Sequence, residues 1–400
     1  MTAPAPGPRS GRERAAMAAL YLGGFLGPFG GGVLVVLVPE LTDVFDASTA
    51  AVTAGITVYV LPFAALQLVS GTIGERLGHG RTIRWAYLSY ALTSFGAALA
   101  PGIAAFLAMR SLQGASNAFT SPLLLAALAE TSTSERLGRS MGTFASVQTA
   151  GMVMAPLCGG LIGALDPRLA FAVPGLAALV LALAPLPART HVRRAEPARL
   201  RDAFNRRSSL VAAAGFLAFL AINGVAFLVA LRAADRFGLD TTARGLLLAG
   251  FGLAGVLAGR PAGGLVDRFG PRPVVLAGAL VSGAMIAVLG LAGSIVGLAA
   301  AWFAAGVASQ FIWAGLNTLA VRSAPENRGG AISVVGAFKF AGNAVAPLVW
   351  LPVYLDRPAL AFALAGAAAA VIAVVVQGVR PPFEAAEPPA ERARAAAAAQ

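Results

Sequence analysis

Two positively charged residues, Arg110 and Lys339, lie well inside apolar segments of this sequence. A charge near the centre of a bilayer is costly, and in most cases it faces a protein interior or a water-filled cavity. Lys339 lies about ten residues into its segment, roughly 15 Å along a helix, beyond the reach of its side chain to the nearer end. Arg110 is closer to the start of its segment, so it either faces a cavity or extends to the surface. Both cations can bind a negative or acceptor group, and lysine, unlike arginine, can also release a proton.

Amide and indole side chains accompany the two cations. Arg110, Gln113 and Asn117 are spaced i, i+3, i+7 and therefore share one face of a helix. Asn343 follows Lys339 by one helical turn. The other polar candidates inside apolar segments are Gln148, Asn223, Gln310, Trp313 and Asn317. We interpret all of these as candidate substrate-binding residues, with hydrogen bonds between neighbouring helices as the equally open alternative for the amides.

Acidic and histidine residues are placed differently. All 18 acids lie in loops, tails or segment ends, and neither histidine lies inside an apolar segment. A membrane-embedded metalloenzyme or aspartyl protease would need such residues inside the bilayer, and a serine hydrolase would need a base beside its serine. The sequence therefore argues against an enzyme, and we expect neither a metal nor another cofactor. The single cysteine, Cys158, allows no disulfide within the chain.

The elements that position these residues are apolar segments. The chain is 58% hydrophobic and 12% charged, which leaves too little polar surface for a water-soluble domain. A spanning helix needs about 20 mostly apolar residues. We therefore expect an all-α membrane protein whose first span is retained rather than removed as a signal peptide. The predicted spans are residues 15–37, 50–72, 83–100, 103–129, 140–164, 169–186, 208–232, 243–262, 274–292, 295–321, 330–353 and 358–378.

The positive charge is distributed unevenly over the loops. The net charge is +12, and Lys339 is the only lysine among the 30 basic residues, which leaves 29 arginines. With twelve spans, 23 arginines fall on the side of both termini, five fall on the other side and Arg110 lies within a span. An excess of basic residues marks the cytoplasmic side, so both termini are predicted to be cytoplasmic in an inner membrane. The charge therefore indicates topology, and we expect no nucleic-acid partner. Residues 40–46, on the outer side, are predicted to form an acidic loop.

A short glycine-rich loop with an acid–arginine pair occurs twice, 192 positions apart. The first copy contains Gly71, Glu75, Arg76 and Gly78, and the second contains Gly263, Asp267, Arg268 and Gly270. A loop this short must join two antiparallel helices, and glycine permits their close approach.

A second repeat relates residues 135–157 to residues 326–348, 191 positions on. Together the two repeats predict two halves of six spans each, arranged as parallel repeats about an axis along the membrane normal. The predicted organisation is a cytoplasmic tail (1–14), an N-terminal six-helix bundle (15–186), a basic cytoplasmic linker (187–207), a C-terminal six-helix bundle (208–379) and a disordered tail (380–400). The linker is interpreted either as an amphipathic helix on anionic headgroups or as a solvated segment.

These motifs resemble those of the major facilitator superfamily. The repeated loop resembles the superfamily's helix 2–3 loop, and Arg110 followed by Gln113-Gly114 resembles its helix 4 motif. The helix 5 motif of the drug:proton antiporter branch is similar to the segment containing Gly151, Pro156, Gly159 and Gly160, in which Ala155 replaces a glycine. The resemblance implies twelve transmembrane helices in two six-helix bundles related by pseudo-two-fold symmetry.

The resemblance also implies roles for the motif residues. In the family, the loop acid meets the N-terminal end of a helix in the other half and holds the cytoplasmic side shut. Glu75 would face span 11 and Asp267 would face span 5, with both repeated loops assigned to gating. Glu75, His79 and Gly80 depart from the usual loop sequence. The glycines and proline of the helix 5 motif are assigned to close helix packing.

The function implied is secondary active transport by alternating access. Proton-coupled export of a small molecule is the first prediction, because of the helix 5 motif. A carrier for an organic anion or carboxylate, including an importer, is the alternative, since the spans hold two cations and no carboxylate. A transporter-like membrane sensor is a third hypothesis. The expected partners are a small-molecule substrate, protons and the lipid bilayer, and the protein is expected to be a monomer.

Overall fold

We analysed a computed structural model that describes residues 11–131, 134–186, 205–323 and 328–379. The predicted linker and C-terminal tail lie almost entirely outside these ranges, as does most of the N-terminal tail. The described residues form helices and connecting turns, with no strand among them. The elements of the first half are α1 (Gly11–Gly32), η1 (Val33–Val36), α2 (Val38–Phe45), α3 (Thr49–Leu77), α4 (His79–Ala98), α5 (Ile103–Asn117), α6 (Ser121–Thr131), α7 (Ser134–Gly163) and α8 (Leu169–Leu183).

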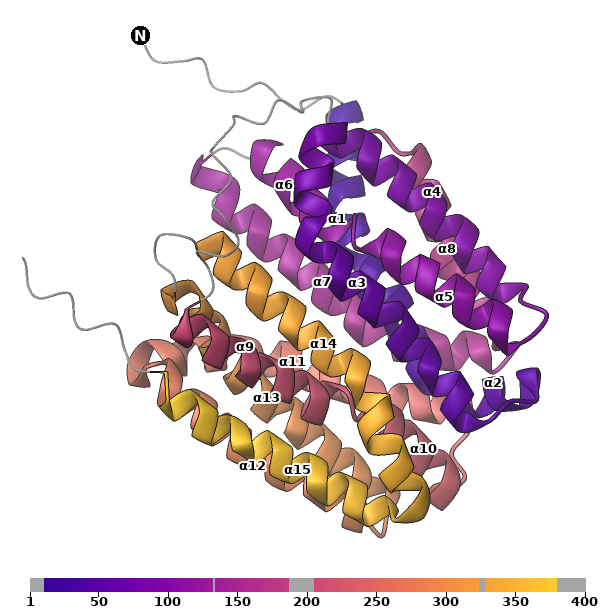
Figure 1. The fold of residues 1–400 in the computed structure, drawn as a ribbon, viewed down its shortest axis with the longest axis vertical. Coiled ribbons are helices and arrows are strands. Elements are labelled where there is room, and N and C mark those ends of the chain that lie inside the picture. Colours follow the sequence, from indigo (N-terminus) through magenta and orange to yellow (C-terminus); the bar gives the residue numbers. More distant parts are fainter. Residues whose placement is uncertain (1–10, 132–133, 187–204, 324–327, 380–400) are drawn as a thin grey trace, which may run out of the picture.

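The second half has a matching series of helices. Its elements are α9 (Arg206–Ala218), η3 (Phe219–Asn223), α10 (Ala226–Phe237), α11 (Thr241–Phe269), α12 (Pro271–Leu291), α13 (Ile295–Ser323), α14 (Arg328–Asp356) and α15 (Pro358–Gln377). Figure 1 shows α1–α8, coloured indigo to magenta, beside α9–α15, coloured red to yellow. The halves meet along two helix pairs, α3 with α14 and α7 with α11. This confirms the predicted all-α architecture of two helical bundles.

Three of the twelve predicted spans are not among the described helices that are long and apolar enough to cross a membrane. In the described residues, nine segments are long and apolar enough to cross a membrane by length and composition alone. The third predicted span, residues 83–100, corresponds to α4, which begins earlier, at His79, and so also includes Arg81. The fourth is divided into α5 and α6 by residues 118–120, and the sixth is the short α8. The predicted acidic outer loop is also wrong in part, because residues 38–45 form the short helix α2.

Both repeated loops are single-glycine turns. Gly78 (φ +87°) separates α3 from α4, and Gly270 (φ +83°) separates α11 from α12. A positive φ is strained for a residue with a Cβ atom, which explains the glycine at each turn.

The internal repeat extends to side-chain packing. Ala155 of α7 lies against Gly32 of α1, where a Cβ atom on the glycine would be 2.8 Å from the Cβ of Ala155. In the second half, Ala346 of α14 is placed in the same way against Gly224. Ala155 is therefore accommodated in its motif because the opposing residue is a glycine, and the second half uses the same solution.

Candidate functional site

The two halves meet differently at the two ends of the helices. We call the end that carries residues 37–48, 164–168 and 238–240 the outer end, and the end that carries the glycine turns the inner end, following the predicted orientation. At the outer end, Arg244 Nη2 of α11 forms an ion pair with Glu40 Oε1 of α2. Thr241 Oγ1 donates a hydrogen bond to the same carboxylate oxygen. Arg244 is only 2% exposed, so this contact between the halves is largely shielded from water.

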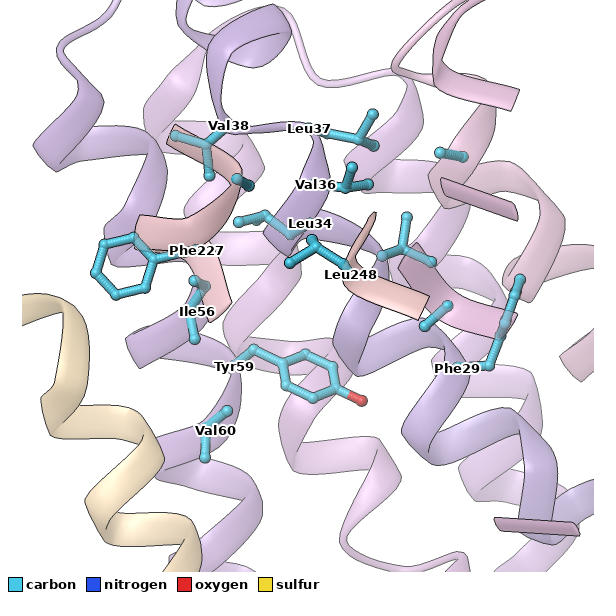
Figure 2. Packing of buried hydrophobic residues seen from close by; sticks show 14 of the residues in the cluster. Phe29, Leu34, Val36, Leu37, Val38, Ile56, Tyr59, Val60, Phe227 and Leu248 are labelled. Carbon is cyan, nitrogen blue, oxygen red and sulfur yellow. The ribbon is translucent and has the colours of Figure 1, made fainter. Parts of the chain in front are cut away.

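A shared hydrophobic core reinforces the outer contact. Figure 2 shows Leu34, Val36 and Tyr59 of the first half packed with Phe227 and Leu248 of the second. The other cluster of buried apolar residues in the described part of the chain belongs to the second half alone. Burial of apolar area is the main stabilising contribution to such contacts inside a protein. The structure therefore holds the halves together at the outer end.

The inner end shows no comparable closure among the described residues. Cβ atoms built on Gly259, Gly263 and Gly264 of α11 would meet no atom within 4 Å. Asp267 and Arg268 are exposed, and no hydrogen bond or ion pair of Asp267 occurs in the described part of the chain.

The first copy of the gating loop is described less fully. Arg76 is exposed, Gly71 has open space around it, and the side chain of Glu75 lies outside the described residues. The latch implied by the repeated loop therefore stays a prediction, and it belongs to a form in which the inner end is closed.

Replacing Asp267 with asparagine tests that latch. The variant is expected to shift the population toward the form open at the inner end, because an amide interacts more weakly than a carboxylate with a helix N-terminus, by about 0.3–1 kcal/mol. Distances between spin labels on the inner ends of α7 and α11 would report the shift. Unchanged distance distributions would argue against a latch at Asp267.

Lys339 of α14 lies among aromatic side chains where the halves meet. Its Nζ is 4.9 Å from the ring centroid of Phe340, 5.2 Å from that of Phe219 and 5.8 Å from that of Trp313. Phe63 of α3 packs edge-on against Phe340, with centroids 4.8 Å apart. Phe219 in turn contacts Trp313 and Phe340 at centroid distances of 4.8 and 5.7 Å. We call Phe63, Phe219, Trp313, Lys339 and Phe340 the Lys339 cluster.

The ammonium group of Lys339 faces rings rather than carboxylates. Within the described ranges, Lys339 makes no hydrogen bond or ion pair. Lys339 as a residue is half-buried, and its ammonium is attracted to the surrounding rings by cation–π interactions. The arrangement leaves the N–H donors of the ammonium available to a ligand, while the rings offer an apolar surface beside them.

A break in the seventh predicted span adjoins this cluster. The span is made of α9, the π-helical turn η3 and α10, and Phe219 opens the π turn while Asn223 ends it. The side-chain oxygen of Asn223 is buried and has no hydrogen-bond donor among the described residues. Single π turns within helices are frequent at functional sites. Asn223 thus lies one turn beyond Phe219 of the Lys339 cluster, and contact of its side chain with a substrate stays a prediction.

The other polar candidates are scattered. Gln148 donates a 3.4 Å hydrogen bond to Ser121, and Gln310 packs against Gly255 of α11. Asn343 is half-buried one turn beyond Lys339, and Asn317 is exposed. Among these four, only Asn343 is tied by helix geometry to the face of Lys339. Substrate contact by the others stays a prediction.

Arg110 lies inside the first half rather than at the interface. Its guanidinium donates a 3.2 Å hydrogen bond to the carbonyl oxygen of Gly30 and another to Gln113, and it lies 4.2 Å from the centroid of the Tyr59 ring. Asn117 donates to the Tyr59 hydroxyl at 3.0 Å. Arg110, Gln113 and Asn117 are 0%, 0% and 4% exposed, so Arg110 does not extend to the surface. In this form the three residues link α5 to α1 and α3, and direct contact with a substrate remains a prediction for another form.

The glycines of the helix 5 motif lie at close helix contacts. A Cβ atom on Gly151 or Gly159 would come within 2.5 or 3.2 Å, respectively, of a carbonyl oxygen in the first span. One on Gly160 would come within 3.0 Å of the Cα of Gly245 in α11, and one on Gly245 within 2.5 Å of the Pro156 carbonyl oxygen. The motif thus packs α7 against its own half on one side and against the second half on the other.

Breaking the outer ion pair should favour opening of the outer end. Glu40→Gln removes the charge while keeping the shape, and it leaves Arg244 buried beside a neutral partner, which is unfavourable. We expect a several-fold population shift toward the form open at the outer end. Spin-label distances across that end would measure it, in a Cys158→Ser background that removes the native thiol.

The double variant Glu40→Gln, Arg244→Gln provides the control. Because it removes both charges, it should recover part of the shift, as expected for residues that interact directly. Strictly additive effects of the two substitutions would mean that the ion pair does not hold the halves together.

Some of these residues were missed at the sequence level. Phe63, Phe219 and Phe340 were not predicted as site residues, although Phe340 adjoins Lys339 and Phe219 lies one turn before Asn223. Glu40 and Arg244 were counted only as outer-side charges. Within the described ranges, no group of three or more His, Cys, Asp or Glu residues could hold a metal ion.

Comparison with known proteins agrees with this architecture. The sequence profile of the Major Facilitator Superfamily matches residues 20–240 and 211–399. A multidrug resistance protein B homolog of Mycobacterium tuberculosis is 37% identical over 156 residues, which are 38% of this chain and 29% of that protein. The tetracenomycin C resistance and export protein of Streptomyces glaucescens is 28% identical over 159 residues, 40% of this chain and 29% of that protein. Each match thus covers less than a third of the relative's length.

Solved structures share the fold. The crystal structure of a D-xylose-proton symporter superposes with a TM-score of 0.78 at 16% identity, covering 93% of this chain and 99% of that one. At this identity the likeness concerns the arrangement of helices and not the substrate.

Proposed function

The chain belongs to the major facilitator superfamily, in its drug:proton antiporter-like branch, and we propose that it exports a small amphipathic molecule in exchange for protons. As a member of this family it is a multi-pass membrane transporter for small molecules. The observation that carries the finer proposal is the Lys339 cluster. It combines a cation that has no acidic partner among the described residues with four aromatic rings at the interface of the halves.

The Lys339 cluster suits a ligand that has a flat apolar part and, attached to it, a hydrogen-bond acceptor or a negatively charged group. Aromatic rings stack on the flat part, while the ammonium donates charge-assisted hydrogen bonds to the acceptor group. The Phe63–Phe340 contact joins the two halves, so a ligand that separates these rings acts directly on the movement of one half against the other. The relatives named for multidrug resistance and tetracenomycin export support the choice of export.

Proton exchange is assigned to Lys339. In the proposal its ammonium binds the substrate's acceptor group in one form and gives up a proton in another, so substrate and proton compete for one residue. Arginine cannot take this role, because guanidinium keeps its proton in proteins. The proposal places the protein as a monomer in the cytoplasmic membrane, with both termini in the cytoplasm and the two six-span halves rocking around the cluster.

A carrier for an organic anion or carboxylate is the second candidate. It is favoured by the same unpaired ammonium, which attracts a carboxylate at least as strongly as a neutral acceptor. The two candidates differ in the direction of transport and in the dependence on a proton gradient.

A substrate screen in inverted membrane vesicles separates the candidates. Labelled aromatic acids, neutral aromatic amphiphiles and amphiphilic cations are offered with and without a pH gradient. Uptake that collapses with the gradient supports proton-driven export. Uptake of the acids alone, independent of the gradient, would replace that proposal with the anion carrier, and the absence of flux for every class would favour a sensor.

A further inference from the structure

The π turn in the seventh predicted span is held by an indole from a neighbouring helix. In an α-helix the N–H of Gly224 would donate to the carbonyl oxygen of Leu220, four residues back. Here it donates to the carbonyl oxygen of Phe219, five residues back, at 2.7 Å. The carbonyl oxygen of Leu220 accepts a 2.8 Å hydrogen bond from the indole N–H of Trp350 in α14. Trp350 is 5% exposed, so water has little access to this bond.

Glycine at position 224 belongs to the same arrangement. A Cβ atom there would lie 2.6 Å from the carbonyl oxygen of Phe219 and 2.8 Å from that of Leu220. It would also contact the side chain of Ala346 in α14. Since the backbone atoms of the turn cannot move aside independently, glycine is the residue that fits without changing the turn. The π turn is therefore supported from both sides, by the glycine of its own span and by the indole of α14.

The internal repeat shows that helix packing alone does not require a tryptophan at position 350. Ala155 of α7 and Ala346 of α14 correspond to each other, 191 positions apart, and so do Gly159 and Trp350. A Cβ atom on Gly159 would lie 3.2 Å from the carbonyl oxygen of Val33, which begins the 3₁₀ helix η1, so a large side chain does not fit there. In the second half the same position holds a tryptophan, and the opposing span has the π turn.

The π turn begins at a residue whose ring faces the ammonium of Lys339. The ring centroid of Phe219 lies 5.2 Å from Nζ of Lys339. Conversion of a π turn to an α-helix would rotate the residues on one side of the turn by roughly 100° relative to those on the other. Lys339 and Trp350 are about three turns apart on one face of α14. One helix therefore places both the ammonium and the donor that holds the turn beside it.

We propose that Trp350 is a positioning residue for the Lys339 cluster. Its indole N–H stabilises the π turn, and the π turn sets the place of the Phe219 ring against the ammonium. Trp350 acts through Phe219 and not by contact with the substrate. The consequence for transport rests on the proposed function, whereas the placement of Phe219 is tested without any substrate.

The only lysine of the chain provides the readout. Purified full-length protein grown with isotope-labelled lysine gives the NMR signals of a single lysine side chain, and the rings around its ammonium shift these signals. Trp350→Phe keeps an aromatic side chain and removes the N–H donor. The Lys339 signals should then move in the same direction as in Phe219→Leu, which removes the ring directly. The double variant should move them no further than Phe219→Leu alone, because one residue acts through the other.

Two further variants separate the hydrogen bond from packing. Trp302→Phe removes another buried indole, whose N–H donates to the carbonyl oxygen of Leu248 at 3.4 Å, and should leave the Lys339 signals unchanged. Trp350→His fills less space than Trp350→Phe but retains a ring N–H, so its signals should lie closer to those of the wild type. The opposite order of these two variants would show that packing alone matters and would overturn the proposal.

Gly224→Ala keeps the test decisive if Trp350→Phe folds poorly, because it disturbs the π turn while Trp350 is retained. It should move the Lys339 signals in the same direction, and unchanged signals in a folded variant of either kind would overturn the positioning role. For a substrate identified in the vesicle screen, Trp350→Phe should weaken binding about fivefold, the effect of one neutral hydrogen bond. Shifted signals with unchanged affinity would overturn the substrate site of the proposed function and leave the positioning role supported.

Discussion

Replacing Lys339 with alanine is expected to abolish proton-coupled transport. Hydrogen bonds to a charged group contribute about 1.5–3 kcal/mol, so substrate binding should weaken by about ten- to hundredfold. The residue that we assign to proton exchange is lost at the same time. Substrate binding and vesicle flux, measured between mildly acidic and mildly alkaline pH, would report both effects. Phe338→Ala is the matched control, since Phe338 is the preceding residue of α14 and its side chain is 43% exposed.

The variant Lys339→Arg separates binding from coupling. Arginine keeps the positive charge beside Phe219 and Phe340, so substrate binding should survive within a few-fold. Transport should lose its dependence on pH, because guanidinium does not release its proton in this range. A wild-type pH profile in this variant would mean that Lys339 is not the coupling residue. Asp267 and Glu75 would then be the next residues to test.

Replacing Gly160 with leucine should block transport by preventing closure of the outer end. A Cβ atom there would lie 2.5 Å from the carbonyl oxygen of Thr241 and 3.0 Å from the Cα of Gly245, both backbone atoms of α11 that cannot move aside independently. Overpacking of this kind costs about 1–3 kcal/mol. If the cost falls on the form closed at the outer end, the population of that form drops by about 5- to 150-fold.

Two further variants of α7 control for the size of the new side chain. Gly142→Leu adds the same side chain at a position with no atom within 4 Å of its Cβ, so transport should be retained. Gly159→Leu should impair transport through contact with the first span, because its Cβ would lie 3.0 Å from Val36. Normal transport by a well-expressed Gly160→Leu variant would show that α7 and α11 need not meet at this point.

The helices and their turns follow from local patterns and were therefore predictable. Apolar segments of about 20 residues identify spans, and the acid–arginine loops identify the turns at Gly78 and Gly270. The interruption between α5 and α6 and the presence of α2 were not predicted. Both depend on how short segments pack against neighbouring helices, and hydropathy alone does not contain that information.

The candidate site was predictable only in part. Lys339 was identified because a lysine deep in an apolar segment is unusual, whereas Phe63 and Phe219 are two of 22 phenylalanines with nothing in their local sequence to distinguish them. Arg110 was also identified from the sequence, but its surroundings were not. A buried cation can be satisfied by backbone carbonyls, such as that of Gly30, and the sequence does not reveal whether carbonyls or a cavity surround it.

The four helices at the interface of the halves are long, so a rotation of one half displaces the ends of these helices. α3, α11 and α14 each contain 29 residues and α7 contains 30, so each is about 44 Å long. If the halves rock about the Lys339 cluster, Asp356 at the outer end of α14 lies about 26 Å from the pivot, and each degree of rotation moves it by about 0.4 Å. A substitution at an outer contact such as Glu40 therefore changes the rotation of the halves, and with it the opening at the inner end. Residues that never touch a substrate can in this way set the width of the opening through which the substrate must pass.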